Sequence, residues 1–424
     1  MSWLYGDQQS SHDTSPTIRA VLTHKPEREE LTLKPRPDPK PEEDCQTEPQ
    51  TSTGEAEEGD GTFDAVAMVT RVDTDGDLEE HERPCPMKEA WIMTSGKLRA
   101  KGRLCSVVSR AAKEDPAGCG TPFVSYLGME VAPPWMDDVS ESPRFPDGLR
   151  EAVYKAEHAG VIGKFTALFP DPAYSREGYV RTLYLHKPPG PFATYEKSEY
   201  VVPKSEIVPL VEALADGSDG LSRFERYEED TSCGRDLLVC THGSHDACCG
   251  KFGYPVYQTL RHGYAGASEK QFRVWRTSHI GGHRFAPTLI DFPEGRYWGH
   301  LEPNALKKLV LRKGPVAELG RFYRGWAGLS GKFEQIAERE IFVREGWEWT
   351  RYLKSGRTLV PYENEDRADV RIEYATPGGD TGAYEATVET NGTVMTLFDS
   401  GSCPLQEVKQ YHVSRLERVR LGRR

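Results

Sequence analysis

The spacing of hydrophobic residues changes near residue 85. Residues 25–61 are rich in Pro, Glu, Asp and Thr and carry almost no large apolar side chain. Such a segment buries too little apolar surface to offset the entropy lost on ordering. We therefore predict that residues 1–85 form an acidic, largely disordered tail, in which only the run at 63–72 has strand character.

Strand and helix patterns alternate in residues 86–230. Residues 123–131 predict a strand, and residues 145–160 repeat apolar and alanine positions at helical spacing. Three more strands and a closing helix are predicted at 161–169, 179–187, 192–202 and 204–217. This order predicts an α/β unit with a partly antiparallel sheet.

A similar order recurs in residues 231–314. The short apolar run at 236–240 is typical of a buried parallel strand. A helix from about residue 250, a strand at 272–278, a hairpin at 288–301 and a helix at 302–314 are predicted after it. We interpret this unit as thioredoxin-like with a reduced middle helix, and the preceding unit as its diverged repeat.

The rest of the chain predicts two smaller parts. Residues 315–346 have a helical pattern and are expected to form a bridge. Residues 347–424 alternate as strands do at 368–376, 382–390 and 393–400, which predicts a small β-rich C-terminal domain that ends in a basic helix or coil at 413–424.

Charge and hydropathy narrow the class of protein. The 424 residues carry a formal net charge of −12, which gives no general attraction to nucleic acid or to anionic lipid. No apolar run approaches the roughly 20 residues of a membrane-spanning helix. The N-terminal residues show neither the basic region nor the apolar region of a signal peptide. We expect a cytoplasmic protein without a nucleic-acid or membrane partner.

Four candidate ligands lie in the two loops that follow the strands of the second unit. Cys240 and Cys249 have C-x8-C spacing, and His279 and His283 have H-x3-H spacing with two glycines between them. The two loops leave neighbouring strands at their C-terminal ends, where α/β folds place their sites. Two thiolates and two imidazoles suit zinc or an iron–sulfur cluster rather than magnesium or calcium. The glycines let the backbone turn so that both rings face one centre.

The residue types leave several alternatives open. Zinc sites usually space their cysteines as C-x2-C to C-x4-C, so the wider spacing leaves zinc and an iron–sulfur cluster equally open. Cys248 competes with Cys249 as a ligand, although a helix beginning at Cys249 would stabilise the Cys249 thiolate. His242 and His245 are expected to make hydrogen bonds in the loop. Two cysteines of the first unit, Cys105 and Cys119, are expected to be packing or turn residues without a histidine partner.

The ligand-bearing runs resemble the sucrase/ferredoxin-like family of thioredoxin-like ferredoxins. These runs are CTHGSHDACCG at 240–250 and HIGGHRFA at 279–286, and the sequence YRGW at 323–326 extends the resemblance. The resemblance covers roughly residues 100–345. It implies that Cys240, Cys249, His279 and His283 bind a [2Fe-2S] cluster and that residues 231–314 form the ferredoxin domain.

This resemblance implies electron transfer to or from a redox partner protein, with the chain a one-electron carrier rather than a catalyst. Two other functions remain open. One is a structural zinc module. The other is a thioredoxin-like thiol oxidoreductase that would use Cys248 or Cys249, although the chain has an adjacent Cys-Cys pair there in place of C-x-x-C.

Overall fold

The computed structural model describes residues 103–420 except 217, 266–271, 362–363 and 403. The predicted acidic tail and its strand-like run therefore lie outside the described residues. None of the described helices is both long and apolar enough to cross a bilayer.

The first unit has the predicted order of elements. It consists of β1 (Ser125–Glu130), α2 (Leu149–His158), β2 (Lys164–Leu168), β3 (Tyr179–His186), β4 (Glu196–Pro203) and α3 (Ile207–Asp216). β1 pairs parallel with β2 and antiparallel with β3, and β3 pairs antiparallel with β4. The mixed sheet predicted for this unit is therefore confirmed.

The second unit repeats this order and these pairings. It consists of β5 (Arg235–Cys240), α5 (Tyr254–Gly263), β6 (Phe272–Thr277), β7 (Leu289–Phe292), β8 (Arg296–Trp298) and α6 (Pro303–Leu311). β5 pairs parallel with β6 and antiparallel with β7, and β7 pairs antiparallel with β8. Only a short 3-10 turn, His283–Phe285, lies between β6 and β7, as expected for a reduced middle helix.

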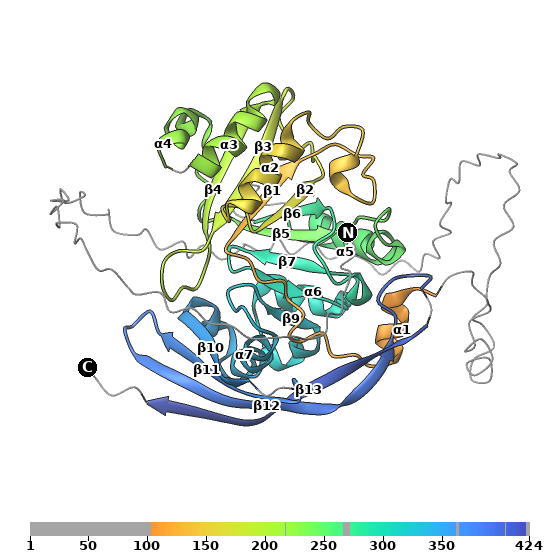
Figure 1. Cartoon of the computed structure of the whole chain (residues 1–424), viewed down its shortest axis with the longest axis vertical. Coiled ribbons are helices and arrows are strands. Elements are labelled where there is room, and N and C mark those ends of the chain that lie inside the picture. The colour runs from red at the N-terminus through yellow and green to blue at the C-terminus, as the bar shows by residue number, and fades with distance from the viewer. Residues whose placement is uncertain (1–102, 217, 266–271, 362–363, 403, 421–424) are drawn as a thin grey trace, which may run out of the picture. The chain divides into compact units, whose positions relative to one another are not determined.

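The two units share one mixed sheet of nine strands. Its order is β4-β3-β1-β2-β6-β5-β7-β8-β9, and the units meet where Leu168 of β2 pairs with Thr277 of β6 (Figure 1). The last strand, β9 (Tyr323–Trp326), lies in the range expected to be helical. That expectation is wrong for these residues, because all four are buried and three of them pair with β8. The helical pattern is correct for α7 (Lys332–Glu345).

A separate antiparallel sheet follows α7. Its strands are β10 (Leu353–Pro361), β11 (Arg367–Ala375), β12 (Thr381–Thr396) and β13 (Gln406–Arg420), paired in that order. The two predicted strands at 382–390 and 393–400 are mostly one strand, β12. The basic end of the chain is a strand rather than a helix or coil, because it pairs with β12. The pairing runs from Gly382 opposite Arg420 to Thr396 opposite Gln406. Apolar residues of this sheet share one core with α7, and Figure 1 shows α7 beside the strands of this sheet.

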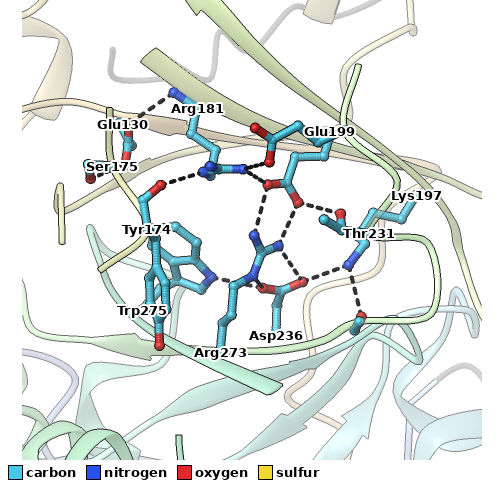
Figure 2. Close-up of polar contacts among 12 residues, drawn as sticks. Glu130, Tyr174, Ser175, Arg181, Lys197, Glu199, Thr231, Asp236, Arg273 and Trp275 are labelled. Carbon is cyan, nitrogen blue, oxygen red and sulfur yellow. Dashed lines mark hydrogen bonds and ion pairs between the residues drawn. The ribbon is translucent and has the colours of Figure 1, made fainter. Parts of the chain in front are cut away.

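A buried network of charged side chains connects the first and second units. The guanidinium of Arg273 on β6 donates to Glu199 of β4 at 2.8 and 2.6 Å and to Asp236 of β5 at 2.7 Å. Figure 2 shows these two carboxylates on either side of the guanidinium. Burial by itself raises the pKa of Asp236, but the charges of Arg273 and Lys197 outweigh it and lower the pKa to about 2. The network is therefore ionised at neutral pH.

A second buried cation lies at the start of the C-terminal sheet. Lys354 of β10 is fully buried, and its Nζ donates to the backbone carbonyls of Trp349 at 3.0 Å and Tyr352 at 2.5 Å. Burial, and then the charge of Arg296, lowers the pKa of Lys354 to about 7. The backbone of Lys354 also exchanges two hydrogen bonds with Phe192, which lies before β4. This residue thus joins the C-terminal sheet to the first unit.

Replacement of Arg273 by Met should destabilise the fold by about 3–5 kcal/mol, because it leaves two buried carboxylates without their cation. The measurement is the free energy of unfolding in denaturant. Arg261→Met is the matched control, because Arg261 pairs with the single carboxylate Asp171 at a more exposed position. A loss at Arg273 no larger than the loss at Arg261 would contradict this account of the network.

Lys354 should make stability depend on pH. Between about pH 7 and 10.5 the unfolded chain binds a proton at Lys354 that the folded chain does not, so stability rises with pH across this range, by up to about 1.4 kcal/mol per unit. Below about pH 7 both states bind the proton and the difference is constant. Lys354→Met should flatten this slope relative to the unaltered protein. Equal slopes in the two proteins would show that Lys354 is charged in the fold.

Candidate functional site

The site begins where the two parallel strands of the second unit end. Cys240 is the last residue of β5 and pairs with Thr277, the last residue of β6, so the loops after both strands start at the same edge of the sheet. Cys249 begins a π-helical turn, Cys249–Gly253, that leads into α5. A Cβ atom on Gly253 would clash with the carbonyl oxygen of Cys240. The glycine therefore lets this helix start against the end of β5.

The structure brings the four predicted ligands to this edge. Ligand atoms of Cys240, Cys249 and His279 lie within 4.8 Å of one another. The sulfur of Cys249 is 3.9 Å from Nδ1 of His279, and the ring centroids of His279 and His283 are 5.2 Å apart. The two intervening glycines have φ values of 93° and 71°, which confirms the tight turn expected between the histidines.

The pKa values of the two cysteines move in opposite directions, because each sulfur is a hydrogen-bond partner of the other. A hydrogen bond from Cys249 lowers the pKa of Cys240 well below its ordinary value, and His279 lowers it further. The same hydrogen bond, with burial, raises the pKa of Cys249. The two sulfurs thus act on each other directly. The expectation that the helix start favours the Cys249 thiolate stays a prediction.

His242 makes hydrogen bonds in the loop, as predicted. Its Nε2 lies 2.7 Å from the carbonyl oxygen of Met136, and its Nδ1 accepts from the backbone N–H of His279 at 3.2 Å. These partners select the tautomer with the proton on Nε2. Burial lowers the pKa of His242 and also that of His279, so both rings are held neutral, the form that binds metals. His242 therefore orients a candidate ligand.

His245 lies closer to the candidate ligands than the sequence indicated. Its ring centroid is 3.8 Å from that of His279, and a nitrogen of each of His245, His279 and His283 lies within 4.8 Å of the others. Its Nδ1 is 2.7 Å from a carboxylate oxygen of Asp137. The His245 side chain is 29% exposed and that of His283 is 16% exposed, so His245 is the more accessible of the two rings. No residue spacing signals the contact of His245 with His279, because it depends on how two loops pack.

The loop after β1 of the first unit covers the site. The ring centroids of Trp135 and His242 are 5.6 Å apart, and the carbonyl oxygen of Trp135 accepts a hydrogen bond from Ser244 at 2.6 Å. With the contacts of Met136 and Asp137, this loop lines one side of the histidines. The first unit thus contributes to the site through contacts that its sequence did not predict.

A second group of side chains holds the other cysteine of the loop. The sulfur of Cys248 lies 3.6 Å from that of Cys105, and both side chains are fully buried. Asp246 accepts from the backbone N–H and the hydroxyl of Ser400 at 2.9 and 2.8 Å. Cys105, Asp246 and His283 also lie within 4.8 Å of one another and can hold a metal ion. The prediction that Cys105 lacks a histidine partner is therefore wrong. The sulfur of Cys119, the other cysteine of the first unit, lies 3.9 Å from a guanidinium nitrogen of Arg284.

The loop between β12 and β13 contacts His283. The Nε2 atom of His283 is 2.6 Å from the carbonyl oxygen of Phe398 and 3.1 Å from a carboxylate oxygen of Asp399. Its Nδ1 is buried and has no hydrogen-bond partner among the described residues. A buried imidazole nitrogen without a partner is costly unless a ligand occupies it. Nδ1 is therefore the nitrogen of His283 that is free to bind a ligand.

The residues fit a bound metal centre. Two sulfurs and the imidazoles of His279 and His283 lie beyond the end of β5, and Nδ1 of His283 has no hydrogen-bond partner among the described residues. Sulfur and imidazole nitrogen are ligands of zinc and iron rather than of hard cations. The four candidate ligands fall into two overlapping sets, one with both cysteines and His279 and the other with three histidines, and a third set with Cys105 and Asp246 shares His283. The ligand assignments themselves stay predictions.

The comparison with known families covers this site. Residues 118–325 match the sucrase/ferredoxin-like family. This range holds all four candidate ligands and every strand of the nine-stranded sheet, apart from Trp326 at the end of β9. Searches of the curated proteins and of the solved structures gave no match. Residues 118–325 of this chain belong to the sucrase/ferredoxin-like family.

Proposed function

We propose that the protein transfers electrons through a [2Fe-2S] cluster bound by Cys240, Cys249, His279 and His283. The observation that carries the proposal is the division of the donors into two overlapping sets. His279 lies within 4.8 Å of both cysteines in one set, and of His283 in the other. The four donors therefore extend over a longer site than the surroundings of one ion. When bound, such a cluster accepts and releases one electron at a time.

Zinc fits this arrangement less well. Ligands of one tetrahedral zinc ion are bonded at about 2.0–2.3 Å, so they lie roughly 3.5 Å from one another. The four donors do not all gather within 4.8 Å, since the two cysteines and His283 do not occur in one set. A single zinc ion would need the histidine loop to move so that His283 joins the two cysteines and His279. Two bridged metal ions could instead bind different ligands of the four.

A thiol oxidoreductase needs a sulfur that a substrate can reach. Cys248 is 0% exposed and Cys249 is 1% exposed. The sulfur of Cys248 accepts hydrogen bonds from Ser106 N–H at 3.4 Å and lies 3.3 Å from the Ser400 hydroxyl, in the group that also holds Cys105. These contacts give Cys248 a packing role and no open side for disulfide exchange.

The chain's own residues would serve an electron carrier in three ways. The imidazoles donate less negative charge than thiolates and so favour a higher reduction potential than four cysteines would. The buried walls keep water from the sulfurs. The ring of His245 lies 3.8 Å from that of His279, centroid to centroid, and is partly exposed, so it gives a short path to the surface. We expect a redox partner protein to approach there.

Protein purified without oxygen should be coloured and contain iron and acid-labile sulfide in equal amounts. Chemical analysis and the visible spectrum test this, with the electron paramagnetic resonance signal after reduction as a second readout. Colourless protein with one zinc per chain and no signal would contradict the proposal and support the structural zinc module.

Cys249→Ser should abolish or severely distort the cluster spectrum, because Cys249 lies within ligand distance of Cys240 and His279. Cys248→Ser is the matched control, since it changes the adjacent residue but alters a sulfur that faces Cys105. Its spectrum should be nearly unchanged. The reverse pattern would make Cys248 the ligand.

A further inference from the structure

Arg324 lies directly beneath the loop that carries His279 and His283. It belongs to β9, and its side chain is 1% exposed. A Cβ atom on Gly282 would clash with the guanidinium, and one on Gly299 would lie 2.9 Å from Cδ of Arg324. Two glycines therefore provide the space through which this side chain reaches the histidine loop.

The guanidinium holds the backbone on two sides. Its Nη1 donates to the carbonyl oxygen of Gly281 at 3.0 Å, and its Nη2 donates to that of Cys119 at 2.7 Å. Its Nε is buried with no hydrogen-bond partner among the described residues. The rings of Phe285 and Tyr297 lie 5.6 and 5.3 Å from the guanidinium carbon. These partners are all neutral.

No carboxylate of the described residues forms an ion pair with Arg324. By contrast, the equally buried Arg296 pairs with Glu338 at 3.0 Å, and Arg273 pairs with two carboxylates. Burial lowers the pKa of Arg324, yet an arginine in a protein keeps its proton. A buried cation without a counter-ion is costly unless negative charge comes from elsewhere.

Arg324 is linked to the candidate metal site through the histidine loop. The carbonyl oxygen that accepts from its Nη1 belongs to Gly281, which lies between His279 and His283. Burial lowers the pKa of Arg324, whereas Cys119 and Tyr297, and to a smaller extent Cys240, raise it. The guanidinium therefore lies next to the loop that carries two of the candidate ligands.

We propose that Arg324 is a positioning residue that holds the histidine loop at Gly281 and supplies the fixed positive charge that favours the reduced state of the centre. This inference rests on the proposed function. Two thiolates and two neutral imidazoles leave an oxidised [2Fe-2S] site without net charge, and one added electron makes it negative. A nearby cation in a buried, weakly screening environment stabilises that added charge.

The test compares midpoint potentials of Arg324→Gln and Arg324→Lys with the unaltered protein. Gln can still donate to the Gly281 carbonyl but carries no charge, so it should weaken the preference for the reduced state about tenfold, a decrease of about 59 mV for a one-electron couple. Lys keeps the charge, so the midpoint potential of Arg324→Lys should stay close to that of the unaltered protein. Iron and sulfide content is measured in each protein, so that loss of the cluster is separated from a shift in potential.

A second pair of variants leaves Arg324 in place. The thiol of Cys119 acts on the charge of Arg324, and its sulfur lies 3.9 Å from Nη2 of Arg284. Cys119→Asp therefore brings a carboxylate close to these guanidinium groups and should lower the midpoint potential, whereas Cys119→Asn, its uncharged match, should not. This pair decides the question if Arg324→Gln does not fold. Unchanged potentials in loaded Arg324→Gln, equal shifts for Gln and Lys, or no difference between Asp and Asn at residue 119 would each overturn the role of the charge. Such results would not affect the electron-carrier proposal. If the unaltered protein proves to contain no iron, both the electron-carrier proposal and the role of Arg324 are contradicted.

Discussion

The candidate site depends on the parallel pairing of β5 and β6. This pairing places Cys240 opposite Thr277, so the cysteine loop and the histidine loop leave the sheet side by side. The close contact between Gly253 and the carbonyl oxygen of Cys240 then fixes where the following helix begins. Residues nine and more than thirty positions apart in the chain meet for this reason. A change of strand register by one residue would move Cys240 to the other face of the sheet.

The two units show how one topology takes two roles. Both have the same order of elements and the same pairing senses, and their sheets join at the ends of β2 and β6. Only the second unit carries the candidate ligands in the loops after its parallel strands. The corresponding loop of the first unit contacts His242 and His245 instead. The first unit therefore forms a wall of the site, and the loop after β12 forms another through Phe398 and Asp399.

The buried cations of this fold differ in the groups that surround them. Arg273 and Arg296 lie among carboxylates and stabilise the joint between elements. Lys354 donates to carbonyl groups, and its burial lowers its pKa. Arg324 has neutral hydrogen-bond partners only, among the described residues, and it holds the loop that carries His279 and His283. A charge left without a partner inside a protein is a reason to look for the group that balances it.

The sequence by itself determined the order of strands and helices in both units, the four candidate ligands and the glycine turn between the histidines, because periodicity and spacing are local properties. It did not determine β9 or β13, whose strand form comes from pairing with β8 and β12. The stacking of His245, the group around Cys105 and the position of Arg324 were also decided by tertiary structure alone. Each joins segments far apart in the chain, and no local pattern records which distant segment will pack against a loop.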